Sequence, residues 1–198
     1  MIVLTYVSAA ALALFSTPPI APHAGAHPTP KVVLMKHADF IRQSLPGATQ
    51  YFLRTVSIGK DDLAAIRKAS DYTPEDPDVQ FYLGQGDGGK PVGAVLFQQV
   101  DTPHGPLEVG LAFGADGKVI HAAATTATVE TKPWVQEAVA AGLMDRFTGM
   151  RSGDDPRKAL SGLDGKLGGM SSYMSELIAT AVGRGVLLYS TLYKGSAT

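Results

Sequence analysis

The amino-acid sequence predicts an α+β fold, in which a mostly antiparallel sheet carries helices packed on it. Short apolar runs suited to strands come in pairs joined by glycine-rich turns, and a long segment with one apolar stripe follows the last pair. The chain has 198 residues, of which 45% are hydrophobic. It is therefore long enough to bury one core and to carry appended segments.

The first half is predicted to contain a helix, a strand and a second helix. Residues 31–44 place apolar side chains near one helical face, which predicts an amphipathic helix that ends at Pro46-Gly47. Residues 51–58 are typical of a strand. Residues 61–70 are typical of a short helix, because the two aspartates in its first turn interact favourably with the helix dipole.

Two hairpins are predicted next. The first joins residues 79–84 to 92–100, and the second joins residues 105–113 to 118–124. Each connection contains Asp-Gly, and this pair favours a hairpin because the turn needs residues that tolerate positive φ.

Residues 172–193 are predicted to form one long helix with a single apolar stripe. Gly183 and Gly185 lie inside it, where each costs roughly 1 kcal/mol relative to alanine, so we expect close packing to offset them. The glycine-rich stretch before the helix brings backbone N–H groups to its N-terminus, where an anion such as a flavin phosphate is favoured. The alternative is that Ser171 or Ser172 merely caps the helix.

Composition excludes several classes of function. The chain has 17 basic and 18 acidic residues, and it lacks the basic patch expected of a nucleic-acid-binding protein. It has no cysteine, which excludes disulfides and cysteine-ligated iron–sulfur clusters, so a redox role needs a bound organic cofactor. The sequence contains no recognised catalytic motif. Among its five histidines the one pair at i, i+4 spacing, His23 and His27, lies in a Pro/Ala-rich stretch that is not expected to form a helix. No catalytic residue and no metal ligand is predicted.

The N-terminus predicts the compartment. Residues 2–15 are apolar and uncharged, and Ala24-Gly25-Ala26 matches a signal-peptidase site. We expect a signal peptide or membrane anchor at residues 1–16 and a Pro/Ala-rich linker at 17–30. A helix-and-sheet part at 31–100 and a second part at 101–194 complete the predicted organisation. The predicted location of the globular part is the periplasm or the extracytoplasmic face of the cytoplasmic membrane, with membrane contact through the N-terminal segment if it stays uncleaved.

Several motifs occur in an order known from one family. Asp116-Gly117-Lys118 lies in the turn of the second hairpin, Glu130-Thr131 follows it, and Phe147-Thr148-Gly149 precedes the last helix. In this order the chain resembles the FMN-binding domain family, which occurs in the G subunit of Rnf complexes, in the C subunit of sodium-pumping NADH:quinone reductases and in free-standing extracytoplasmic proteins. The resemblance implies that residues 101–194 are the FMN-binding-like domain.

The resemblance implies a set of FMN-binding residues on two segments. One segment faces the flavin ring and the other holds the phosphate at the start of the last helix. These residues are Glu130, Thr131 and Lys132 on the first segment, and Gly168, Gly169, Ser171 and Ser172 on the second. The family's Ser-Gly-Ala-Thr motif, whose threonine carries FMN covalently, is absent here, because Met170 or Ser171 takes the acceptor position. We therefore expect any FMN to be bound noncovalently.

Two functions follow from the resemblance and stay open at this point. In the first, the chain is an FMN-binding accessory subunit of a membrane electron-transfer complex, respiratory or photosynthetic. In the second, it is a flavin-free structural or assembly subunit of such a complex. An electron-transfer or structural subunit is expected in preference to a stand-alone enzyme.

Overall fold

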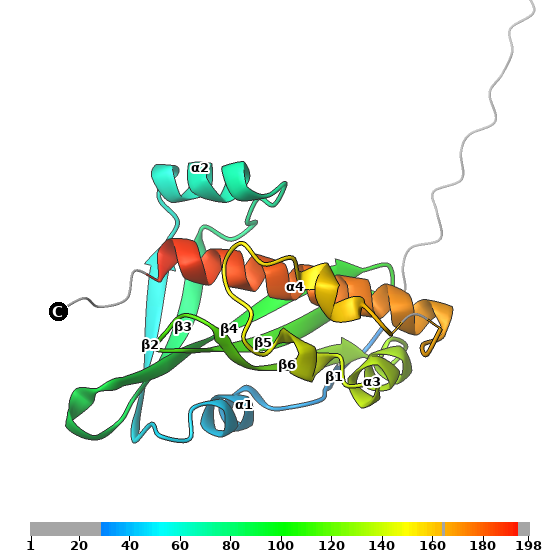
Figure 1. The fold of residues 1–198 in the computed structure, drawn as a ribbon, viewed down its shortest axis with the longest axis horizontal. Coiled ribbons are helices and arrows are strands. Elements are labelled where there is room, and N and C mark those ends of the chain that lie inside the picture. Colours follow the sequence, from blue (N-terminus) through cyan, green and yellow to red (C-terminus); the bar gives the residue numbers. More distant parts are fainter. Residues whose placement is uncertain (1–28, 164, 194–198) are drawn as a thin grey trace, which may run out of the picture.

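A computed structural model describes residues 29–163 and 165–193, and it has the predicted α+β fold. Six strands form one antiparallel sheet in the order β1-β6-β5-β4-β3-β2 (Figure 1). The strands are β1 (Lys31–Val33), β2 (Gln50–Ser57), β3 (Asp78–Gln85), β4 (Pro91–Thr102), β5 (Gly105–Gly114) and β6 (Val119–Thr128). Both predicted hairpins are present, the first as the antiparallel pair β3–β4 and the second as the antiparallel pair β5–β6.

Helices cover both faces of this sheet. The long helix α4 (Gly169–Leu192) packs along β4 and β5 on one face, together with α3 (Lys132–Ala140). The short helix α1 (His37–Ser44) lies on the opposite face over β5 and β6 (Figure 1). The helix α2 (Lys60–Ala69) contacts the outer side of α4. The short 3-10 turns are η1 (Asp87–Gly89), η2 (Met144–Phe147) and η3 (Pro156–Leu160).

The prediction of one helix over residues 31–44 is wrong at its start. Lys31–Val33 forms β1 and pairs with Thr126–Thr128 of β6, and the helix begins only at His37. Two consecutive valines favour an extended backbone. The free edge of β6 supplies the hydrogen-bonding partner that this short strand needs.

The main core lies between the sheet and α4. Its aromatic centre is a stack in which the Phe113 and Tyr189 rings are 4.0 Å apart and nearly parallel. Tyr193 stacks on the same tyrosine at 4.7 Å, so the end of α4 is tied to the middle of the sheet. Burial raises the pKa of Tyr189, and its hydroxyl stays protonated over the physiological range.

Gly183 and Gly185 of α4 lie at close packing contacts, as expected from the helix propensity that glycine costs. A Cβ added at Gly185 would overlap Leu111 Cδ1 and lie 3.2 Å from Leu96 Cδ1, and one added at Gly183 would lie 2.9 Å from Pro156 Cγ. The helix therefore approaches the sheet and the η3 turn more closely than any other residue would allow.

The sheet opens between β3 and β4. β3 pairs with β2 over its whole length, but with β4 only from Tyr82 to Gln85. Beyond Val95, β4 remains paired with β5 and has no described partner on its other side. The paired strands β2 and β3, which α2 connects, thus diverge together from the rest of the sheet (Figure 1).

The signal peptide or anchor and nearly all of the linker predicted at residues 1–30 lie outside the described residues. Within the described part of the chain, no helix combines the length and apolar character needed to cross a membrane.

Candidate functional site

The start of α4 brings together the four residues predicted to hold a phosphate. Gly168 is the N-cap, Gly169 is the first helical residue, Ser171 is buried and Ser172 is half-buried. A carboxylate of the protein already lies there, since Glu137 of α3 accepts hydrogen bonds from the Gly168 N–H at 3.1 Å and from the Ser171 hydroxyl at 2.6 Å. Glu137 thus occupies the anion position at this helix terminus.

The environment of Glu137 favours its charged form. The Ser171 hydroxyl and then the Gly168 N–H lower the pKa of the Glu137 carboxyl by hydrogen bonding, against a smaller opposing effect of burial. A negative charge beside a helix N-terminus is stabilised by the unpaired N–H groups and the helix dipole. The alternative that Ser171 or Ser172 caps the helix is wrong, because the N-cap is Gly168 and the Ser171 hydroxyl donates to Glu137 instead.

The second predicted segment forms the corner between β6 and α3. Thr131 is fully buried and exchanges hydrogen bonds with Thr128: its hydroxyl accepts from the Thr128 N–H at 3.0 Å, and its own N–H donates to the Thr128 hydroxyl at 3.2 Å. The connection between β6 and α3 is short, because α3 already begins at Lys132 with Pro133 in its first turn. Thr131 therefore fixes the direction in which α3 leaves the sheet.

Glu130 and Lys132 flank this corner at its surface. Glu130 lies 2.9 Å from His104 Nδ1, and the His104 ring contacts the edge of Trp134 at 5.3 Å between centroids. Lys132 is half-buried at the first position of α3. The only tryptophan of the chain thus packs beside the contact between His104 and Glu130.

The structure brings the two predicted segments to neighbouring helices. Glu130 and Thr131 precede α3, Glu137 belongs to it, and α3 packs on the beginning of α4 (Figure 1). None of the seven predicted residues lines any of the three clefts described next. Sequence reasoning missed Glu137, and no spacing signal exists for a residue that caps a helix more than thirty positions away.

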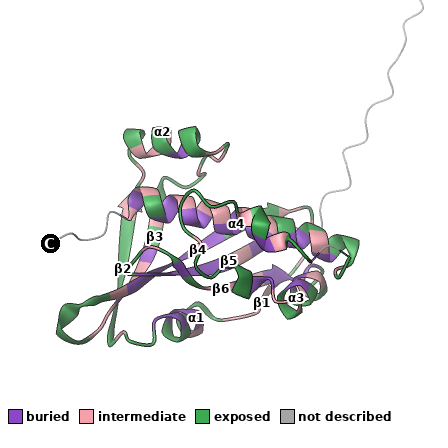
Figure 2. Cartoon of the chain, viewed as in Figure 1, coloured by how far each residue is buried: buried purple, intermediate pink, exposed green. Residues whose placement is uncertain are grey.

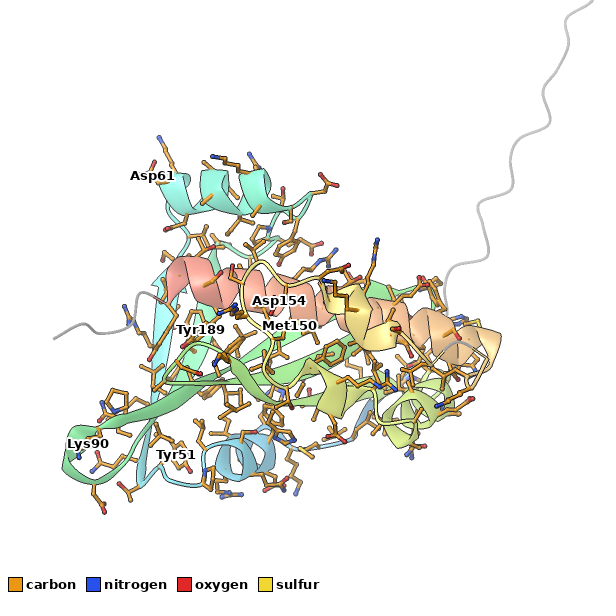
Figure 3. The ribbon with its side chains drawn as sticks, viewed as in Figure 1. Tyr51, Asp61, Lys90, Met150, Asp154 and Tyr189 are labelled. Atoms are coloured by element: carbon orange, nitrogen blue, oxygen red, sulfur yellow. The ribbon has the colours of Figure 1, made fainter. Side chains whose placement is uncertain are left out.

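The largest of the three clefts, the α4 cleft, lies over the middle of α4 and has a volume of about 720 Å³. Its walls are the end of α2 and the loop that carries Met150 and Asp154 over the helix (Figure 3). The Arg184 guanidinium covers the Tyr72 ring at 4.7 Å from its centroid. Charges of both signs line this cleft, namely Arg157, Arg184, Asp71, Asp154 and Asp155. The lining therefore has no excess of positive charge that would select a phosphate.

The second cleft, the α1 cleft, lies where β1 and the start of α1 meet β5, and it measures about 420 Å³. Glu108 lines this cleft; its carboxylate accepts hydrogen bonds from Thr125 at 2.6 Å and Thr126 at 3.2 Å, and lies 2.7 Å from His37 Nε2. Burial opposes ionisation of Glu108, but these hydrogen bonds and the His37 imidazole together lower its pKa. His37 also stacks on Phe97 at 3.7 Å, so its ring is held in place from two sides.

The third cleft, the strand gap, measures about 340 Å³ and lies between the diverging ends of β3 and β4. It is lined on the β3 side by Asp76, Asp78, Val79, Gln80 and Tyr82, and on the β4 side by Leu96, Phe97, Gln98 and Gln99.

One serine–histidine pair is present, away from the clefts. Ser44 Oγ and His121 Nδ1 lie 2.7 Å apart, and His121 stacks on Phe40 at 5.0 Å. Burial lowers the pKa of His121, with a smaller opposite effect from Asp145. Ser44 is only 5% exposed and lines none of the three clefts, so this pair joins α1 to β6 and does not present a nucleophile.

Among residues 29–163 and 165–193, no group of three or more histidine and carboxylate side chains converges as a metal site would require.

The fold and the site together define an α+β protein whose long helix is capped by a carboxylate from a neighbouring helix. No protein-family description, no curated protein and no solved structure matches the chain.

Proposed function

We propose that this protein is a non-catalytic accessory subunit that docks on the extracytoplasmic part of a membrane electron-transfer complex. The observation that carries the proposal is the free edge of β2. Support for the kind of complex comes from the motif order that the chain shares with FMN-binding domains. The proposal has a flavin-free version and a version with noncovalent FMN, and Glu137 favours the first.

The β2 strand has the properties of a docking edge. It is the last strand of the sheet, and no described strand pairs with its outer side. Tyr51, Phe52 and Leu53 are consecutive and are 40%, 45% and 55% exposed, and the strand is exposed along nearly its whole length (Figure 2). Proteins usually blunt such edges with charge or cover them, and exposed apolar clusters mark interaction sites.

Few features of the β2 edge oppose pairing with another strand. Arg54 is the only charged residue among the eight residues of the strand, and the strand contains no proline. A partner strand added to this edge would gain main-chain hydrogen bonds and contacts with the apolar side chains on both faces.

The flavin-free version is supported by the geometry at the start of α4. A flavin phosphate bound there would need the Gly168 N–H and the Ser171 hydroxyl, and both donate to Glu137. Two anions at one helix terminus repel each other, so phosphate binding would require Glu137 to leave or to take up a proton.

Flavin titration separates the two versions. We expect the purified full-length protein to leave FMN fluorescence unchanged, because Glu137 occupies the anion position. If FMN binds, and if Ser171→Ala weakens that binding, the version with noncovalent FMN replaces the flavin-free one.

Docking is tested in membranes solubilised with a mild detergent. We expect the wild-type protein to sediment with a large complex and Leu53→Lys to sediment free, because a lysine on this edge opposes strand addition. Val139→Lys is the matched control, since Val139 is also an exposed apolar residue but lies on α3. Sedimentation of the wild-type protein as a free monomer, or equal loss in both variants, would contradict docking through β2.

A further inference from the structure

The strand gap exposes backbone that a sheet normally pairs. From Leu96 onward, alternate residues of β4 direct their N–H and C=O groups away from β5, toward the side that β3 has left. Unpaired strand edges of this kind accept an added strand.

One backbone carbonyl at this edge of β4 already accepts a hydrogen bond from a side chain. The Gln98 amide is buried and donates to the Gln99 carbonyl at 2.9 Å. A side-chain N–H thus makes a bond of the type that the N–H of a neighbouring strand would make. The β4 edge at the strand gap therefore has no strand paired with it, but one of its backbone carbonyls accepts a hydrogen bond from a side chain.

The charges around the strand gap have one sign. Asp76, Asp78 and Glu108 line it, whereas its only basic residue is His37, which is paired with Glu108. The two aspartates accept hydrogen bonds from the Asp78 N–H and from Ser57. In the described part of the chain neither aspartate has a basic partner.

Aromatic rings line the same gap. Tyr82 and Phe97 meet edge to face at 5.7 Å, and Tyr72 lines the gap from the side of α4. Arg184 covers Tyr72 but lines the α4 cleft and not the gap. Aromatic faces next to carboxylates favour the aliphatic stem and the charged end of a lysine or arginine.

We propose that the strand gap binds an extended segment of a partner polypeptide, which adds a strand to the free edge of β4 and places a basic side chain beside Asp76 and Asp78. The main-chain hydrogen bonds supply affinity, and the acidic and aromatic lining supplies the preference for a basic residue. This site is distinct from the β2 edge, so it stands or fails independently of docking through β2.

A peptide selection tests the proposal. The full-length protein in detergent is used to select from a phage-displayed library of random octapeptides, with Asp76→Asn/Asp78→Asn as the matched control. Asparagine keeps the oxygens that accept from the Asp78 N–H and from Ser57 while removing both charges, so the fold is retained. We expect enriched peptides with lysine or arginine among β-branched residues, and at least tenfold weaker binding to the double variant.

Amide NMR shifts then locate the bound peptide. We expect the largest changes at residues 96–101 of β4. Enrichment without a basic residue, equal binding to the double variant, or shifts confined to β2 would each overturn the proposal. Absence of any enriched peptide would overturn it as well. None of these results depends on Leu53, so they are distinguishable from failure of the β2 docking site.

Discussion

Replacing Gly185 with alanine will destabilise the protein, although alanine is the better helix former. The helix-propensity gain is about 1 kcal/mol. Against it, the new methyl group overlaps Leu111 Cδ1 and lies 3.2 Å from Leu96 Cδ1, and overpacking of this kind costs typically 1–3 kcal/mol, occasionally more. Because both neighbours are fully buried in the core, we take the upper part of that range. The net loss in the free energy of unfolding is then about 1–2 kcal/mol.

The assay is urea unfolding followed by circular dichroism, with thermal unfolding alongside. A loss of this size lowers the Tm by about 2–4 °C for each kcal/mol in a chain of this length. Gly169→Ala is the control, because a Cβ there meets no atom within 4 Å. In a Leu111→Ala background the cost of Gly185→Ala should vanish, since the overlapping atom is gone. A Gly185→Ala protein as stable as the wild type would refute the close approach of α4 to the sheet.

Three further predictions concern the buried and capping polar groups. Because the folded-state pKa of Glu108 lies below its ordinary value of 4.5, its contribution to stability is present above that pH and disappears as the pH falls through the folded pKa. Urea titrations should therefore show a steeper acid loss for the wild type than for Glu108→Gln. Thr131→Val removes the acceptor of the buried Thr128 N–H and should cost about 1–3 kcal/mol in the free energy of unfolding, measured by the same method. A titration followed by carbonyl NMR should show that the Glu137 carboxyl has a pKa below its ordinary value. Ser171→Ala should raise that pKa, because the hydrogen bond from the Ser171 hydroxyl is the main cause of the shift. The same pKa in both proteins would show that this hydrogen bond does not stabilise the Glu137 carboxylate.

The parts of the fold that sequence predicted well depend on local signals. The hairpins follow from Asp-Gly turns between strand-like runs, and α4 follows from one apolar stripe over 24 residues. The close packing at Gly183 and Gly185 was also predictable, since two glycines inside a helix need a reason. β1 was missed because three residues carry no period, and their partner in β6 lies about ninety-five positions away.

In the candidate site, too, the sequence predicted the features that depend on neighbouring residues and missed those that depend on tertiary packing. Sequence reasoning could assign donors to the start of α4, because a helix N-terminus always has unpaired N–H groups. It could not foresee that Glu137 would reach them, since that contact depends on how α3 packs against α4. The strand gap was equally hidden, because the divergence of β3 from β4 is a property of the twisted sheet and not of either strand alone.

Photo-cross-linking from position 53 shows whether the β2 edge contacts a membrane complex. A benzoylphenylalanine replaces Leu53 in the full-length protein, and native membranes are irradiated before solubilisation. Docking through β2 predicts a product in which the chain is joined to a subunit of a membrane electron-transfer complex, with no such product from the same probe at Val139. Irradiation that leaves the chain uncross-linked, or that joins it equally from both positions, would contradict the claim.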